Sequence, residues 1–148
     1  MFSNAPIEAP SIKIDRRALN QAHEEIRAAL TELRGQLAAS KPVLPALTAT
    51  RMKLARANRA RSEAMEALLD QITRRGGIAM SRATSMQTDL RRFHASASSH
   101  IARWGCPHIT ADWQGYREAS LALSRATVAQ MTAKILMLDK IDRLANRP

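Results

Sequence analysis

The sequence has few aromatic residues, a single cysteine and no long run of apolar residues. Aromatic residues make up only 3% of its 148 residues, and the 5 glycines and 6 prolines cluster in a few places. Strands are normally enriched in aromatic and β-branched residues, whereas alanine, leucine, arginine, methionine and glutamate favour helix. Because the second group dominates here, the composition predicts an almost entirely helical chain.

The shortage of cysteine and of apolar runs also bears on where the protein works. With Cys106 alone no intrachain disulfide can form, which is typical of a reducing cytosol. The N-terminal residues, MFSNAPIEAPSIKID, lack the basic start and apolar run of a signal peptide. No apolar stretch approaches membrane-spanning length. We therefore expect a cytoplasmic protein without a membrane segment.

Sequence motifs of common enzymes are missing as well. There is no Gly-rich phosphate loop, no Gly-x-Ser-x-Gly nucleophile elbow, no Cys-x-x-Cys pair and no His-Glu-x-x-His. Since no strands are expected, Rossmann and P-loop folds are excluded. We expect a protein that is not an enzyme.

The chain does carry a strong excess of positive charge. Its net charge is +10: residues 1–40 are neutral, while residues 41–75 hold eight basic and three acidic residues and residues 76–148 hold ten and five. A basic surface favours nucleic acid, anionic lipid or an acidic protein partner. The alternative is a solvated, Arg-rich helical surface, because no block of five or more like charges occurs. If there is a partner, we expect the dense segment RMKLARANRAR, with Arg56, Arg59 and Arg61, to contact it.

Apolar residues recur at spacings of three and four in four segments, which predicts four long helices. We expect these at about residues 16–39, 44–74, 78–104 and 111–145, with Pro- and Gly-containing connections between them. Four long helices with short connections predict an all-α, up-down-up-down antiparallel four-helix bundle over residues 15–148, preceded by an extended arm of residues 1–14. We expect a monomer or a homodimer.

Each helix has an expected buried stripe. The first helix steps through Leu19, His23, Ile26, Leu30, Leu33 and Leu37, so a histidine takes a seam position. The third helix steps through Leu90, Phe93, Ala97, Ile101 and Trp104, flanked by His94 and His100, and the fourth through Leu121, Val128, Met131, Ile135 and Leu138. The middle of the second helix offers little to bury, so its packing must be thin or covered by long arginine stems.

Three of these helices resemble those of a known family. The first, AHEEIRAALTELRGQL, resembles the opening helix of hemerythrin-like (HHE cation-binding) domains, where a histidine followed by Ile/Leu-Arg begins a leucine-rich seam. The third, LRRFHASASSHI, is similar to that family's third helix, with His94 at the ligand position, and the fourth is similar in length and apolar rhythm. The resemblance spans residues 16–145 and implies a bundle that holds a pair of iron atoms.

The chain departs from that family at the ligand positions. The family's second and fourth helices each carry His-x-x-x-Glu, whereas this chain has Arg59 and Glu63 in the second helix and Val128 and Thr132 in the fourth. The residual metal positions are then His23, His94 and Glu63. A di-iron centre needs about five or more protein ligands, so we expect none to assemble. One zinc or iron remains an alternative, and so do plain core histidines that bond to each other or to a serine.

A second set of potential ligands lies between the last two helices. His100, Cys106 and His108 combine imidazole and thiol, which suit zinc, but no fourth ligand is near. The alternative is a helix end with a buried thiol and two exposed imidazole rings. Three functions stay open. They are a degenerate hemerythrin-like bundle that acts as a small binding or regulatory protein, a basic helical module for nucleic acid or an acidic protein, and an oxygen or nitric oxide sensor with an unusual metal site.

Overall fold

The computed structural model describes residues 15–75 and 78–145, and these residues form five helices and no strand. The prediction of an all-helical chain is thereby confirmed. The arm expected for residues 1–14 and the glycine pair at 76–77 lie outside the described residues. The helices are α1 (Arg17–Leu37), α2 (Leu44–Arg75), α3 (Ile78–Arg103), α4 (Cys106–Ala111) and α5 (Trp113–Ala145).

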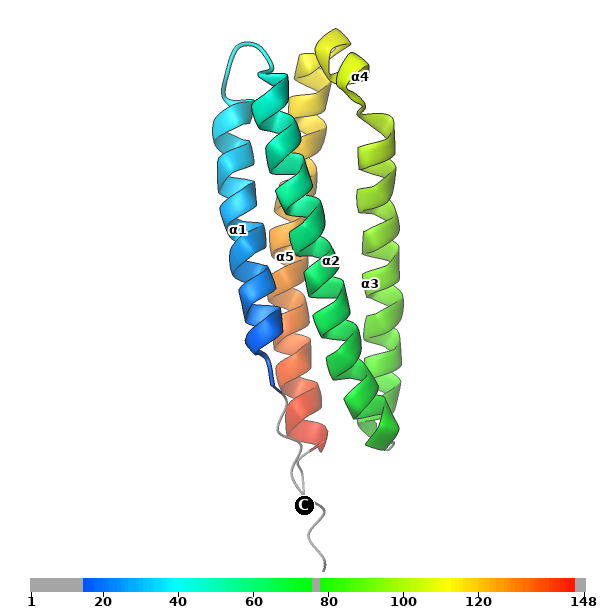
Figure 1. The fold of residues 1–148 in the computed structure, drawn as a ribbon. Coiled ribbons are helices and arrows are strands. Elements are labelled where there is room, and N and C mark those ends of the chain that lie inside the picture. The colour runs from blue at the N-terminus through cyan, green and yellow to red at the C-terminus, as the bar shows by residue number, and fades with distance from the viewer. Residues whose placement is uncertain (1–14, 76–77, 146–148) are drawn as a thin grey trace, which may run out of the picture.

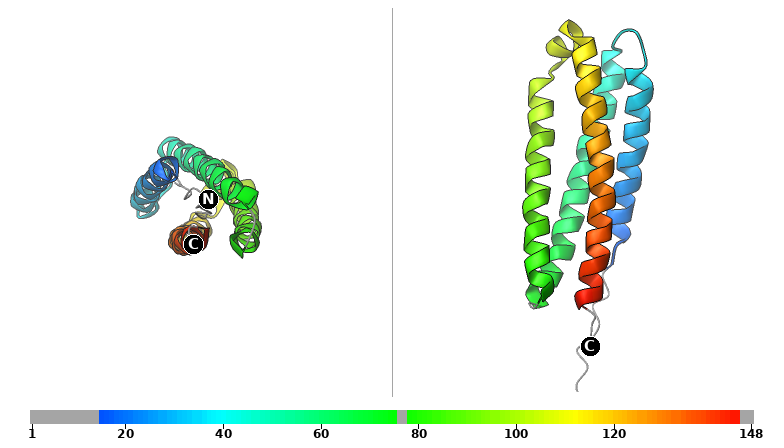
Figure 2. Two further views of the ribbon diagram at one scale, coloured as in Figure 1. Left: turned by 90° about the horizontal axis from the view of Figure 1, so that it is seen from below. Right: turned by 180° about the vertical axis from the view of Figure 1, so that it is seen from behind.

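The four long helices lie side by side along the length of the molecule (Figure 1). From α1 to α2, α3 and α5, each runs in the opposite direction to the one before it, and short α4 covers the end where α3 stops and α5 begins (Figure 1). Viewed along their axes, the four helices surround a common interior, and the view from behind places α5 between α3 and α1 (Figure 2). Among the described residues, no helix combines the length and apolar character that a membrane crossing requires.

Short helix α4 is the one element that the apolar stripes did not predict. Gly105 has extended backbone (φ −70°, ψ 163°), and Pro107 follows in the first turn, where its fixed φ suits a helix and its missing N–H costs nothing. Asp112 then leaves helical geometry (φ −140°, ψ 72°). Its carboxylate accepts a hydrogen bond of 2.9 Å from the backbone N–H of Gly115, so Asp112 caps α5.

The buried apolar residues form three clusters of unequal size. A lower cluster, at the end of the molecule where α2 ends and α3 begins, contains Leu19, Met65, Leu68, Leu69, Ile72, Ala83, Met86, Leu138 and Ile141. An upper cluster, at the end that carries α4, contains Leu33, Leu37, Leu47, Trp104, Ile109 and Tyr116. Between them lies a third, smaller cluster of Ile26, Ala57 and Met131, at the level of the buried polar residues His23 and Arg61. The thin packing expected in the middle of α2 is therefore present.

The expected stripes hold for α1 but not throughout α3 and α5. Ile101 and Val128, expected inside, expose 52% and 45% of their surface. In α5 the buried residues Met131 and Leu138 of the expected stripe share the interior side with Ser120, Thr127 and Lys134. The hydroxyl of Thr127 donates to the carbonyl of Leu123 at 2.8 Å, so a polar residue is buried without losing its hydrogen bond. Because some of these interior residues are polar, the spacing of apolar residues alone does not identify the buried face of α5.

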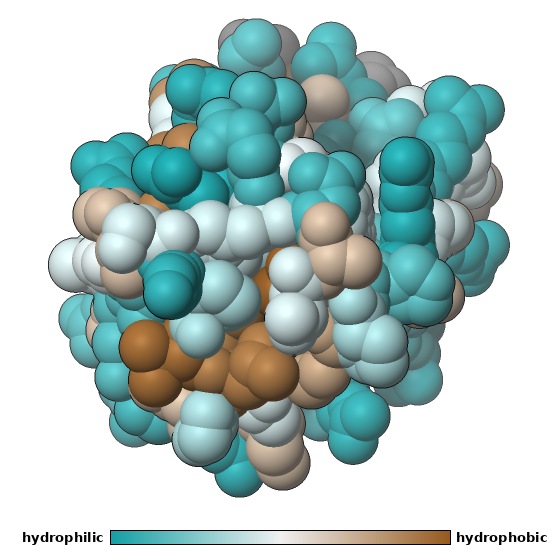
Figure 3. Space-filling view, turned by 90° about the horizontal axis from the view of Figure 1, so that it is seen from above, coloured by the Kyte–Doolittle hydropathy of each residue, from teal (hydrophilic) through white to brown (hydrophobic). Residues whose placement is uncertain are grey.

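Aromatic rings gather at the upper end. Tyr116 is buried, and its ring centroid lies 5.9 Å from that of Trp113 and 5.6 Å from that of Trp104. The indole N–H of Trp113 donates to the carbonyl of Ala39 at 3.1 Å, which ties α5 to the α1–α2 connection. Seen from this end, hydrophobic atoms show among mainly hydrophilic ones (Figure 3), and Val43 exposes 62% of its surface. The rings therefore cover one end of the core.

Candidate functional site

A layer of polar side chains crosses the thin middle of the molecule, which we call the polar centre. It consists of His23 on α1, Arg61 on α2 and Gln130 on α5, with Phe93 of α3 beside them. Arg61 is only 4% exposed and His23 only 3%. The Arg61 guanidinium donates to the Gln130 side-chain oxygen at 2.7 Å and lies 5.3 Å from the centroid of the Phe93 ring. A buried cation is therefore held by one hydrogen bond and by a ring face.

Burial sets the protonation of the polar centre. It is the main cause that lowers the pKa of His23 to about 4, and the positive charges of Arg61 and Arg27 lower it further. The pKa of Arg61 is also lowered by burial. Within the described part of the chain, His23 Nε2 and Arg61 Nε have no hydrogen-bond partner. The polar centre thus consists of a neutral imidazole beside a buried guanidinium.

The three residual metal positions do not converge on the polar centre. His23 points inside, but His94 and Glu63 are exposed. Across residues 15–75 and 78–145, no three His, Cys, Asp or Glu side chains lie close enough to hold a metal ion. Arg61 brings a fixed positive charge to the level of His23, which opposes a cation there. These residues do not fit the di-iron group that the resemblance implies.

The second set of potential ligands is divided between two helices. His100 on α3 is half-buried, its Nε2 lies 3.4 Å from the Ser120 hydroxyl, and its ring stacks on Tyr116 at 5.9 Å between centroids. Cys106 and His108 belong to α4 and are exposed, so the expectation of a buried thiol was wrong. The imidazole of His100 is therefore engaged with α5, away from the thiol.

The three arginines expected at a contact surface separate into two kinds. Arg56 and Arg59 are exposed on α2, whereas Arg61 lies in the polar centre and is unavailable to a macromolecular partner. The reason is helical spacing. Arg61 is four residues from buried Ala57 and four from buried Met65, so it lies on the interior face of α2. The expectation that Arg61 belongs to the contact surface was therefore wrong.

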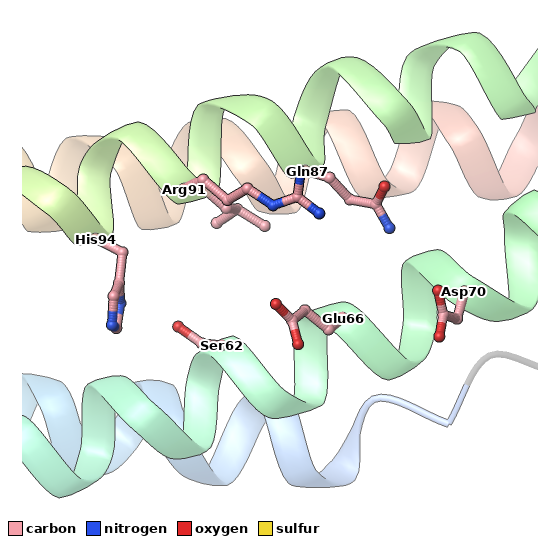
Figure 4. Close-up of a pocket in the computed structure, with 7 residues that line it drawn as sticks. Ser62, Glu66, Asp70, Gln87, Arg91 and His94 are labelled. Carbon is pink, nitrogen blue, oxygen red and sulfur yellow. The ribbon is translucent and has the colours of Figure 1, made fainter.

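A polar groove opens between α2 and α3, with a volume of about 370 Å³. Ser62, Glu66 and Asp70 line it from α2, and Gln87, Arg91 and His94 from α3, together with Leu90 (Figure 4). Both acidic and basic groups reach this α2–α3 groove, and within the described residues no hydrogen bond joins Ser62 to His94. The sequence signal for it was the spacing of three or four between these polar residues on each helix.

A smaller cavity of about 60 Å³ lies among α1, α2, α3 and α5 above the polar centre. Its polar lining includes Arg51, Asn58, His100, Ser120 and Thr127. The pKa of His100 is lowered by burial and by the charges of Arg51 and Arg103. Apolar side chains make up most of the remaining lining, and a cavity of this size has room for a few water molecules beside its polar groups.

Comparisons with protein-family models, with curated proteins and with solved structures found no match to this chain. A function for this chain is therefore inferred from its own residues and their geometry.

Proposed function

We propose that this chain is a hemerythrin-like, up-down-up-down four-helix bundle that lacks a di-iron centre and acts as a small cytoplasmic binding or regulatory protein, not as an enzyme. The alternating directions of α1, α2, α3 and α5 support the bundle (Figure 1). The hemerythrin likeness is supported by the histidine in the α1 seam, since His23 is buried between Leu19 and Ile26.

One observation carries the proposal: the guanidinium of Arg61 occupies the interior at the level of His23. In a metal-binding bundle, the inward positions of all four helices supply histidines and carboxylates. Here α2 supplies a cation, α5 supplies the amide of Gln130, and α3 supplies the ring of Phe93. None of these three groups is a usual iron ligand. A bundle core of this composition favours a binding role over oxygen or redox chemistry.

Elemental analysis tests the proposal. Protein made in iron-rich medium is expected to contain no stoichiometric iron or zinc and to show no oxo-bridge absorption bands. A pair of iron atoms per chain, with absorption bands that disappear in His23→Ala and His94→Ala but persist in His108→Ala, would overturn it and favour the sensor hypothesis. His108 is a suitable control because it is exposed on α4, outside the interior.

The second candidate function is the basic module that binds nucleic acid or an acidic protein. The observation that favours it is the net charge of +10 together with exposed, like-charged Arg56 and Arg59 on α2. Retention on nucleic acid that weakens steeply with salt, and that is lost on charge reversal at these arginines, would support this candidate.

A further inference from the structure

A second groove, of about 570 Å³, lies on the outer surface between α1 and α5. Its lining is mainly apolar and includes Leu30 of α1 with Leu121, Val128 and Ala129 of α5. Val128 exposes 45% of its surface, although it is a β-branched apolar residue. We call this feature the α1–α5 groove. It leaves an apolar strip uncovered along two neighbouring helices.

Three arginines, Arg27 and Arg34 on α1 and Arg125 on α5, also line the α1–α5 groove, and no Asp or Glu does. All three are exposed, and within the described residues none of them forms an ion pair. Other basic residues of the molecule do have such partners, as Lys134 has with Asp89 at 2.9 Å. The groove thus combines apolar surface with uncompensated positive charge on both of its helices.

We propose that the α1–α5 groove binds an acidic amphipathic helix of a partner protein. This inference rests on the proposed function, because it identifies the kind of partner that such a binding protein takes. A helix laid along the groove places its apolar stripe on Leu30, Leu121 and Val128, and its flanking carboxylates reach the arginines. Arg27 and Arg34 are seven residues apart, about 10 Å along α1, which matches acidic residues at i and i+7 of the partner.

Other occupants fit the α1–α5 groove less well. A second copy of the chain that presented the same surface would bring like-charged arginines together, which opposes a symmetric dimer here. Single-stranded nucleic acid favours aromatic side chains on which its bases stack. No aromatic residue lines this groove, and its apolar strip forms no favourable contact with a phosphate backbone. An acidic amphipathic helix both pairs with the arginines of the groove and covers its apolar surface.

The test uses the full chain and a synthetic helical peptide of about 18 residues, with leucines at i, i+3, i+4 and i+7 and glutamates on both flanks. We expect binding that weakens as salt rises. The double substitution Arg27→Glu and Arg34→Glu should weaken it at least about tenfold, and Val128→Asp similarly. The matched controls are Arg82→Glu with Arg92→Glu, two exposed arginines of α3, and Leu136→Asp, an exposed apolar position of α5 outside the groove. All these positions are exposed, so the variants should keep the wild-type circular dichroism.

Several outcomes would overturn the inference. These are no peptide binding, equal binding of a peptide with lysine in place of glutamate, or an equal loss in the control variants. A dimer that dissociates on Arg27→Glu, or an oligonucleotide whose binding depends on the groove arginines, would also overturn it by assigning the groove to another occupant. The iron content tests the proposed function independently of peptide binding. A failure of the groove proposal therefore does not imply a failure of the proposed function, and the reverse also holds.

Discussion

At the scale of single residues, Arg61 is the most unusual feature of the molecule. Moving a guanidinium out of water is costly, and one hydrogen bond with one ring face compensates only part of that cost. Arg61 has a single hydrogen bond, to Gln130, within the described residues, and its Nε has no partner. The same charge acts on His23, so the two residues form one electrostatic unit in the polar centre.

His23 gives the first prediction at this scale. Its pKa is about 4 in the folded chain, against an ordinary value of 6.5, so between these values the unfolded chain binds the extra proton. Stability should therefore fall as the pH drops from about 6.5 to about 4, by roughly 3 kcal/mol over the whole window. In His23→Leu this part of the loss should disappear. Urea unfolding of both proteins at a series of pH values measures this difference in the free energy of unfolding.

The control for this prediction is His94→Leu. His94 is exposed and lies outside the polar centre, so its replacement tests whether removal of any histidine has the same effect. A His23→Leu variant whose stability falls with pH as steeply as that of the wild type would show that another group titrates in this window.

At the scale of helices, α5 shows how a buried face can be made with few apolar residues. Its interior side includes Ser120, Thr127 and Lys134, while apolar Leu136 points outward with 58% of its surface exposed. The Lys134 ammonium is paired with Asp89 of α3 at 2.9 Å, which makes its burial tolerable. Burial on α5 therefore follows helix position more closely than residue type.

Two leucines of α5 test this assignment. Leu138 is fully buried in the lower cluster, so Leu138→Ala should lower the free energy of unfolding by roughly 2–5 kcal/mol. Leu136→Ala removes the same atoms from an exposed site and should change it by less than about 0.5 kcal/mol. Denaturant unfolding compares the two. Equal losses would mean that the outward face of α5 is covered in solution.

The sequence predicted the positions of the helices better than it predicted which of their residues are buried. The four long helices were predicted within a few residues because their apolar spacing and Pro or Gly connections are local signals. Helix α4 was missed, since six residues that include Pro107 resemble a connection. Arg61 was expected at a contact surface because several arginines lie close together in that stretch, whereas its spacing from buried Ala57 and Met65 places it on the interior face of α2. The two grooves combine residues from different helices, and spacing along one helix groups its own residues without specifying which helix lies opposite.

At the scale of the whole molecule, the helices are unequally embedded. Helix α1 buries residues along its full length, from Leu19 to Leu37. In α3, no described residue beyond Met86 is fully buried, although Leu90 and Phe93 are partly covered. The second half of α3 thus has the least apolar burial among the long helices. Segments of this kind open at lower free energy than the rest of a protein.

Amide hydrogen exchange should reveal this difference. We expect the amides of residues 93–103 in α3 to exchange at least about tenfold faster than those of residues 23–33 in α1, after correction for intrinsic rates. Both stretches lie within long helices, so hydrogen bonding alone does not distinguish them. Equal protection would mean that α3 opens only when the whole molecule unfolds.

The gathering of aromatic rings at the upper end also determines what fluorescence can report. Both tryptophans of the chain, Trp104 and Trp113, lie beside Tyr116, and the lower cluster contains none. Tryptophan emission therefore follows the upper end alone, whereas far-ultraviolet circular dichroism averages over all helices. Thermal melts recorded by the two signals coincide only when both ends unfold together. Separate midpoints would show that the upper end unfolds as a cooperative unit distinct from the rest of the bundle.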